Sequence, residues 1–160
     1  MNRQADIKRA EGKAKTIKKT FSRETFISTT IFADPAIVWV LLTRASDFPR
    51  WNSTVTAVKG EIKEGGTIEL KSILDQKRTF KLRVKEFVPE KRLVWGDAMG
   101  NRVYTLDKGT DGGVLFTMTE KISGPLLPLF ASSIPSFDET FERFAADLKK
   151  EAETIQRSKT

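Results

Sequence analysis

The most informative stretch of the sequence is TIELKSILDQKRTFKLRV, residues 67–84. Ile68 and Leu70 alternate with polar neighbours, and Phe80 and Leu82 alternate with lysine and arginine. A repeat of two residues is typical of a β-strand with one buried face and one solvated face, and such strands usually pair antiparallel. The stretch therefore predicts neighbouring strands of an antiparallel sheet.

Further strand patterns lie on both sides of this stretch. Residues 25–32 are rich in β-branched and aromatic side chains, which favours a first strand. Asp34-Pro35 then combines a helix N-cap with a residue suited to the first helical turn, so a short helix over 36–42 should follow. A second short helix or a turn is expected at 46–51. Beyond these, turn residues punctuate the alternation at 65–66, 75–76, 89–90, 100–101 and 111–113. We count seven strands, six of them in one meander after the short helices.

The C-terminal region changes to a helical repeat. Its apolar residues recur at intervals of three or four: Phe137, Phe141, Phe144, Leu148, Ala152 and Ile155. We expect one long helix beginning near Ser136. Because a helix with a single apolar stripe must lie on something, and the sheet offers one apolar face, the chain predicts a two-layer α+β domain.

The amino-acid composition excludes several kinds of site and catalytic mechanism. The 160 residues fit one domain, and the absence of cysteine and histidine excludes disulfides, thiolate metal sites and catalysis by a Ser-His or Cys-His pair. We expect no metal and no cofactor.

The net charge is +7, of which residues 1–20 carry +5. We therefore divide the chain into a basic N-terminal extension, 1–20, and a domain over 21–160. Apolar residues in and just after the extension recur at intervals of three or four, which indicates a helix that Gly12 weakens: Ile7, Ala10, Ala14, Ile17 and Phe21.

No secretory signal is visible at the charged N-terminus. The longest uncharged stretch, 122–137, is sixteen residues long and contains three prolines, which is too short and too broken to span a bilayer. We expect a cytoplasmic protein.

Four segments stand out when the chain is followed in order: IFADPAIVW at 31–39, DFPRWN at 47–52, PEKRLVW at 89–95 and GPLLPLF at 124–130. Together they resemble the START-like (SRPBCC) superfamily, in particular its polyketide cyclase/dehydrase-type members. The resemblance covers roughly residues 24–153. It implies a helix-grip fold, in which a curved antiparallel sheet wraps around the C-terminal helix and leaves an internal cavity between them.

The resemblance, combined with strand alternation, places a set of side chains around that cavity. The candidate ligand-binding residues are Phe80, Leu82, Trp95, Arg102, Tyr104, Phe116, Met118, Glu120, Leu127, Phe130 and Phe141. The alternative for the aromatic residues is that they only fill a core. Arg102 and Glu120 either reach solvent at the rim or orient a polar group of a ligand, since a charge facing a cavity is costly when unpaired. The apolar loop at 126–130 is either a gate, a membrane contact or a buried connector.

The sequence predicts a binding module for a small hydrophobic molecule of lipid, polyketide or isoprenoid type. The alternative is a cyclase or dehydratase that uses the same cavity, with Glu120, Asp97 or Tyr104 as acid or base and Arg102 as electrophilic partner. The basic extension suggests weak contact with an anionic membrane. Binding of nucleic acid is not expected, because the extension lacks interleaved aromatic residues for base stacking.

Overall fold

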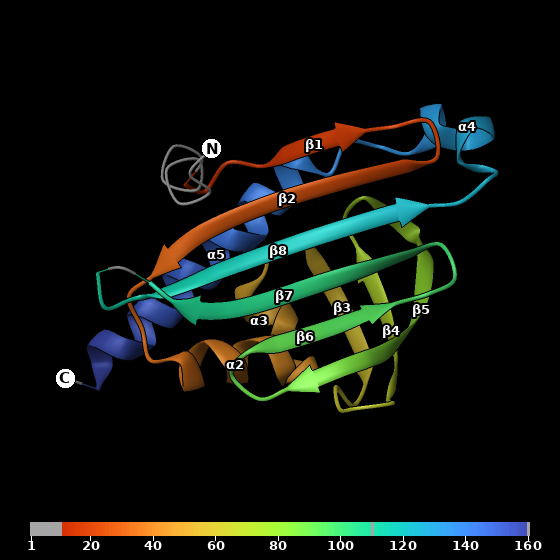
Figure 1. Ribbon diagram of the computed structural model, residues 1–160. Coiled ribbons are helices and arrows are strands. Elements are labelled where there is room, and N and C mark those ends of the chain that lie inside the picture. The colour runs from red at the N-terminus through yellow and green to blue at the C-terminus, as the bar shows by residue number, and fades with distance from the viewer. Residues whose placement is uncertain (1–10, 110, 160) are drawn as a thin grey trace.

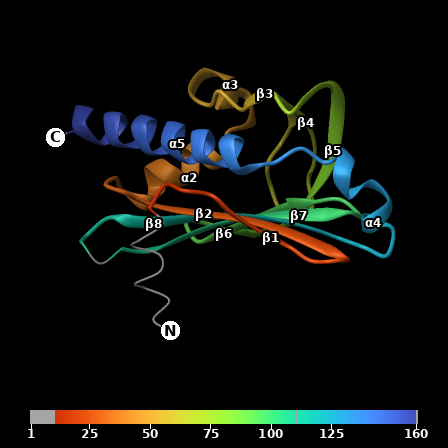
Figure 2. The same cartoon turned by 90° about the horizontal axis from the view of Figure 1, so that it is seen from above.

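The computed structural model of the chain describes residues 11–109 and 111–159. These residues form one curved sheet with helices packed against its inner face (Figures 1 and 2). The strands are β1 Lys15–Lys18, β2 Ser22–Ile31, β3 Val55–Gly60, β4 Thr67–Ser72, β5 Asp75–Val88, β6 Arg92–Gly96, β7 Gly100–Lys108 and β8 Val114–Ser123. The helices are α2 Pro35–Thr43, α3 Phe48–Trp51, α4 Leu127–Phe130 and α5 Asp138–Ser158, with 3-10 turns at Ala45–Asp47 and Ala131–Ser133.

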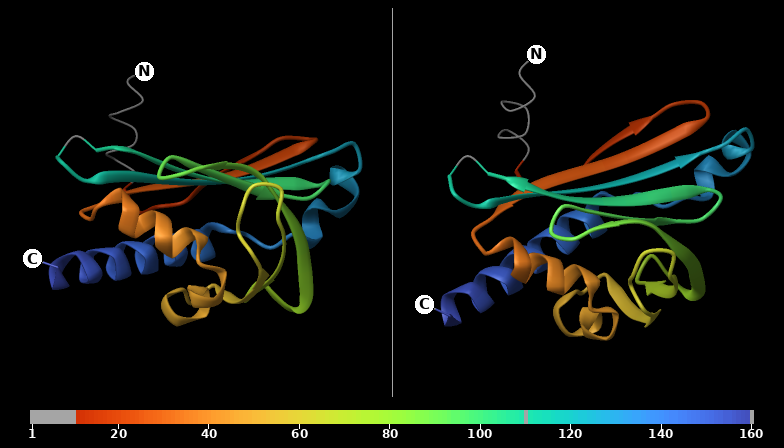
Figure 3. Two further views of the ribbon diagram at one scale, coloured as in Figure 1. Left: turned by 90° about the horizontal axis from the view of Figure 1, so that it is seen from below. Right: turned by 60° about the horizontal axis from the view of Figure 1, so that its bottom comes forward.

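The sheet order is β1-β2-β8-β7-β6-β5-β4-β3, and every neighbouring pair is antiparallel. The register shifts between Val55 and Ala57 in β3, between Leu70 and Ser72 in β4 and between Val84 and Glu86 in β5. Irregularities of this kind bend a strand and increase its twist. The strands that carry them, β3, β4 and β5, curve away from the flatter part of the sheet and partly enclose the inner face (Figure 3).

Helix α5 lies along the concave side of the sheet, as Figure 2 shows from above. Four residues of the predicted apolar stripe are buried, Phe141, Phe144, Leu148 and Ala152, and Ala145 is buried with them. The two end members of the predicted stripe, Phe137 and Ile155, are only partly buried, and Phe137 lies just before the helix. The helix begins at Asp138, two residues after the predicted start. The α+β helix-grip architecture is thereby confirmed.

The two short helices, α2 and α3, lie in the chain between β2 and β3. The Asp34 side chain accepts a hydrogen bond from the backbone N–H of Ala36 at 2.8 Å, and Pro35 occupies the first helical position, as predicted. Helix α2 buries most of its side chains, and Trp39 meets the ring of Phe87 on β5 edge to face at 5.2 Å between centroids. Burial on several sides explains how its β-branched residues stay helical.

The prediction for the N-terminal extension was wrong in part. The sheet has eight strands, not seven, because residues 15–18 form β1 on the edge of β2, with Lys15 opposite Phe26. Despite the helical spacing, this segment is a strand, because the edge of β2 offers backbone hydrogen-bond partners to a neighbouring strand. The boundary between residues 20 and 21 therefore falls inside a β-hairpin. Residues 1–10 of the expected helix lie outside the described residues.

Side-chain contacts also fix this N-terminal segment to the domain. The Ala14 N–H donates to the Glu142 carboxylate on α5 at 3.1 Å, and the Glu11 carboxylate accepts from the Thr29 hydroxyl at 2.8 Å. The Thr16 hydroxyl donates to Asp138 in the first turn of α5. The segment from residue 11 onward is therefore part of the folded domain.

Replacing Thr16 by Val should lower the free energy of unfolding by about 1–2 kcal/mol, because the hydrogen bond to Asp138 joins β1 to α5 and is partly buried. Urea denaturation measures the effect. Thr67→Val, at the exposed start of β4, is the matched control and should change stability little. Equal effects of the two substitutions would show that the Thr16–Asp138 hydrogen bond does not stabilise the domain.

Candidate functional site

A cavity of about 750 Å³ lies between the inner face of the sheet and the first turns of α5. It is partly open to solvent. Its walls come from β3 to β8, from the turn between β6 and β7, and from the segment that leads into α5. The lining residues are Thr54, Val55, Leu70, Ser72, Leu74, Asp75, Arg78, Phe80, Leu82, Trp95, Gly96, Asp97, Met99, Gly100, Arg102, Met118, Glu120, Ile122, Phe130, Ser133, Ile134, Pro135, Phe137, Thr140, Phe141 and Phe144.

An aromatic cluster bounds the inner end of this cavity. The ring of Phe144 on α5 lies 5.7 Å from Tyr104, 5.7 Å from Trp51 and 6.4 Å from Phe116, and Trp95 meets Tyr104 edge to face at 5.1 Å. These spacings are those of packed aromatic side chains. The cluster fills the space under the middle of α5, and the cavity begins at its outer members, Trp95 and Phe144.

Gly96 shows how closely the wall is packed at the turn between β6 and β7. A Cβ atom at this position would lie 2.2 Å from the carbonyl oxygen of Gly100 and 2.9 Å from Cα of Asn101. Only glycine allows the turn to press against β6 in this way. Both glycines line the cavity, so its wall here is backbone rather than side chain.

One ion pair belongs to the cavity wall. Arg102 on β7 and Glu120 on β8 are directly opposite each other, and the Arg102 Nε donates to Glu120 Oε2 at 2.6 Å. The side chains are 19% and 20% exposed, so both charges are largely removed from water. The guanidinium also lies over the Phe141 ring, 5.0 Å from its centroid. Among the described residues, Glu120 is the only carboxylate that pairs with Arg102.

The electrostatics of this pair extend to Tyr104. Burial by itself would lower the pKa of Arg102, but the charge and hydrogen bond of Glu120 outweigh it and raise that pKa above its usual value. Burial raises the pKa of the Tyr104 phenol, and the positive charge of Arg102 offsets this only in part. The Tyr104 hydroxyl is buried without a hydrogen bond of good geometry among the described residues.

The remaining charges lie nearer the edge of the cavity. Arg78, which is exposed, covers the Phe80 ring at 4.6 Å from its centroid. The Asp97 carboxylate accepts hydrogen bonds from the backbone N–H groups of Met99 at 2.8 Å and Gly100 at 3.1 Å, so it holds the turn between β6 and β7 in shape. Over residues 11–109 and 111–159, no three acidic side chains gather in a way that could hold a metal ion.

Eight of the predicted ligand-binding residues line the cavity: Phe80, Leu82, Trp95, Arg102, Met118, Glu120, Phe130 and Phe141. The other three, Tyr104, Phe116 and Leu127, are buried and do not line it. Strand alternation identifies the face of a residue but not its position along the helix that covers it, and Tyr104 and Phe116 lie under α5. Lining residues that sequence reasoning missed include Ile134 and Thr140. Thr140 lies three residues after Phe137 and four before Phe144, so helical spacing places it on the apolar face, but its polar side chain kept it out of the predicted stripe.

Comparisons with known proteins support this architecture. Residues 33–153 match the family described as activator of Hsp90 ATPase homolog 1-like protein (AHSA1). No curated protein is significantly similar in sequence. In the part of the chain that the structure describes, no helix is both long enough and apolar enough to cross a membrane.

Several solved structures share the fold. A conserved protein of unknown function from Enterococcus faecalis has a TM-score of 0.66 at 14% identity, with 97% of this chain and 85% of that chain covered. A START superfamily protein from Mycobacterium smegmatis has a TM-score of 0.59 at 13% identity, covering 82% and 98%. DynU16, a putative protein in the dynemicin biosynthetic locus, has a TM-score of 0.63 at 18% identity, covering 84% of this chain and 49% of that one. At these identities the likeness shows the fold alone, and it is the fold that the START-like resemblance implied.

Tyr104 is the only tyrosine in the sequence, so ultraviolet absorbance titration reports on it alone. Because burial raises its pKa, we expect no phenolate in the folded protein at pH values near 10, the ordinary tyrosine pKa of about 10 appearing only in denaturant. The unfolded chain then releases a proton that the folded chain keeps, so the free energy of unfolding should fall as the pH rises above about 10. A native titration midpoint equal to that in denaturant would contradict the buried position of the hydroxyl.

Proposed function

The chain belongs to the family of activator of Hsp90 ATPase homolog 1-like proteins, and on that premise we propose that it binds a small hydrophobic molecule in the cavity between the sheet and α5. Proteins of this START-like fold commonly hold hydrophobic ligands. The observation that carries the proposal is the cavity itself, about 750 Å³ with mainly apolar side chains on its walls. Sites for small molecules usually have volumes of about 300–1,000 Å³ and few polar groups.

The binding energy comes from removing apolar surface from water. Each Å² of apolar surface that a ligand buries against walls such as Phe80, Leu82 and Met118 contributes roughly 25 cal/mol. A ligand of lipid, polyketide or isoprenoid type presents such surface along most of its length. Burial of apolar surface gives affinity but does little to orient the ligand, because the hydrophobic effect is not directional.

Orientation is the role that we assign to Arg102 and Glu120. Glu120 engages the Nε of Arg102, and Phe141 supports the plane of the guanidinium. The terminal N–H groups of the guanidinium are donors that suit a carbonyl, hydroxyl or carboxylate oxygen. A ligand with one such oxygen at the end of an apolar body would place that oxygen at Arg102 and the body along the aromatic wall.

An enzyme of cyclase or dehydratase type remains the second candidate, because proteins of this fold include cyclase-like members. The chain has no histidine, so the acid or base would be Glu120, Asp97 or Tyr104. Glu120 is paired with Arg102, Asp97 holds a backbone turn, and Tyr104 is buried away from the cavity lining with a raised pKa. Because the two carboxylates already have partners and the phenol does not line the cavity, we favour binding over catalysis.

Two expectations from the sequence stay predictions. One is the cytoplasmic location of the protein. The other is weak contact between the basic N-terminal extension and anionic membranes, since residues 1–10 lie outside the described residues. Nucleic acid is still not expected as a partner.

Filling the cavity should impair binding more than stability. Met118 is fully buried and lines the cavity, so the larger side chain in Met118→Trp can extend into open space. We expect loss of uptake of the neutral apolar dye Nile red, with the midpoint of thermal unfolding nearly unchanged. Dye fluorescence and thermal denaturation of wild type and variant provide the two measurements.

Leu93→Trp is the matched control, since Leu93 is equally buried on β6 but does not line the cavity. Overpacking there should cost about 1–3 kcal/mol of stability. If Met118→Trp proves as destabilising as the control, and the wild-type protein takes up no dye, then these residues are ordinary core and the proposed binding function is wrong.

A further inference from the structure

Four large apolar side chains are exposed at the end of the molecule where the cavity lies. They are Phe21 in the β1–β2 turn, Met99 in the β6–β7 turn, and Leu126 and Leu129 at α4, with exposed fractions of 57%, 43%, 62% and 80%. We call these four residues the apolar tip. Exposed apolar residues are unremarkable when scattered, but a group of them at one place marks an interaction site.

Backbone hydrogen bonds join the segments that carry the apolar tip. The Gly124 N–H donates to the carbonyl of Phe21 at 3.0 Å, and the Ser123 N–H donates to the carbonyl of Met99 at 3.1 Å. Arg23 donates from Nη1 to the carbonyl of Ile134 at 3.1 Å, which ties the β1–β2 hairpin to the segment before α5. Figures 1 and 3 show the hairpin end beside α4 in every view. The apolar tip is therefore one preformed surface.

This surface continues into the cavity wall. Met99 belongs both to the apolar tip and to the cavity lining, and Phe130, which directly follows Leu129, also lines the cavity. A molecule resting on the apolar tip would thus lie at the edge of the cavity.

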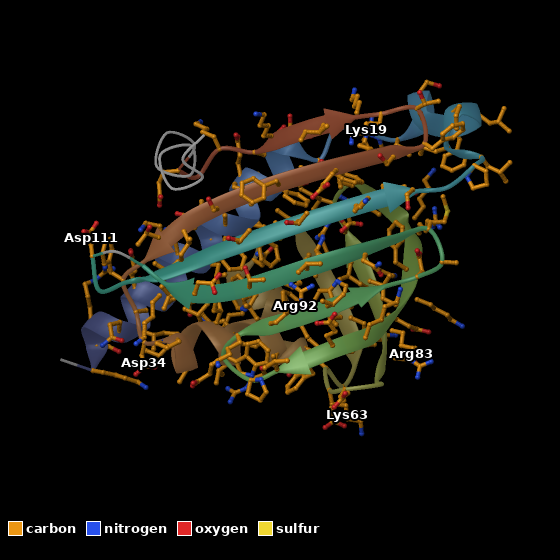
Figure 4. All side chains as sticks on the ribbon, viewed as in Figure 1. Lys19, Asp34, Lys63, Arg83, Arg92 and Asp111 are labelled. Carbon is orange, nitrogen blue, oxygen red and sulfur yellow. The ribbon has the colours of Figure 1, made fainter. Side chains whose placement is uncertain are left out.

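The charge around the apolar tip has one dominant sign. The segments 15–23, 97–101 and 121–137 contain five lysine and arginine residues and one acidic residue, Asp97. Lys18 and Lys19 at the end of β1 are exposed and make no ion pair within the described residues (Figure 4, where Lys19 is labelled). Apolar side chains among unpaired cations suit a surface that is negatively charged outside and hydrocarbon inside.

We propose that the apolar tip, together with Lys18 and Lys19, is a docking surface for an anionic phospholipid membrane. Its leucine, phenylalanine and methionine side chains enter the headgroup boundary while the lysines contact lipid phosphates. A second copy of this chain fits less well, because a symmetric contact would bring like charges together. Docking in this orientation places the edge of the cavity against the bilayer.

Vesicle flotation of the full chain tests this proposal, with vesicles of equal parts phosphatidylglycerol and phosphatidylcholine. Leu126→Ser combined with Leu129→Ser should weaken association about tenfold or more, because the leucines lose their burial in the bilayer. Lys18→Gln combined with Lys19→Gln should weaken it about tenfold, and should also reduce its sensitivity to salt. Vesicles of phosphatidylcholine alone should bind the wild type more weakly.

Two pairs of substitutions elsewhere serve as controls. Val40→Ser with Val88→Ser removes apolar side chains of 44% and 45% exposure on α2 and β5. Lys150→Gln with Lys159→Gln removes one exposed charge on α5 and one directly after its last residue. Neither pair should change vesicle association. Equal weakening by test and control pairs would overturn the proposal, as would a wild type that does not float with anionic vesicles, or one that forms a dimer abolished by the leucine substitutions.

A direct readout is available because the chain has no cysteine. Leu129→Cys labelled with an environment-sensitive fluorophore should shift its emission to shorter wavelength on addition of the anionic vesicles, and Val88→Cys with the same label should not. Uptake of Nile red by the leucine variant without vesicles should equal that of wild type. Failure of docking with normal dye uptake would refute the docking surface and leave the proposed ligand binding intact.

Discussion

The structure depends on one constraint, which is that the apolar stripe of α5 must be covered. Phe141, Phe144 and Leu148 are almost completely buried, and a helix that carries such side chains on one side only is stable against a matching surface. The inner faces of β2 and β8 supply that surface beneath the helix. Because α5 is straight and the sheet is curved, a helix that fits closely on β2 and β8 leaves β4 and β5 at a distance. The cavity is the geometric result of this mismatch rather than a separate element.

The aromatic cluster decides where packed core ends and open space begins. Phe144 contributes to both, since it stacks within the cluster and also lines the cavity. The wall beyond it combines apolar side chains with the paired Arg102 and Glu120, whose burial would be costly if either stood alone. In the proposed ligand site, the apolar part of the wall would accept ligands of different shapes, and the ion pair would favour one orientation of the ligand.

Periodicity predicted the architecture well, because alternation along β4 and β5 and the three-to-four spacing in α5 reflect burial directly. It failed at β1, where a helical spacing within residues 1–20 was overridden by the hydrogen-bonding edge of β2. It also placed Tyr104 and Phe116 on the correct face but at the wrong depth, since depth depends on where the covering helix lies. The direct pairing of Arg102 with Glu120 depends on the register of β7 and β8, which the length of their turn sets and which alternation does not reveal.

The position of β2 between β1 and β8 bears on how the chain reaches this structure. Thr25 in β2 pairs with Glu120 in β8, so the two strands meet only after a long intervening segment has formed. During synthesis, β2 emerges from the ribosome well before β8, the strand it pairs with on its other side. It also emerges before α5, against which it packs. The β1–β2 hairpin can form early, but the inner face of β2 then stays without cover. Contacts between residues so distant in sequence slow folding and expose sheet edges to aggregation. Lysines on β1, at the outer edge of this early hairpin, oppose such pairing between nascent chains.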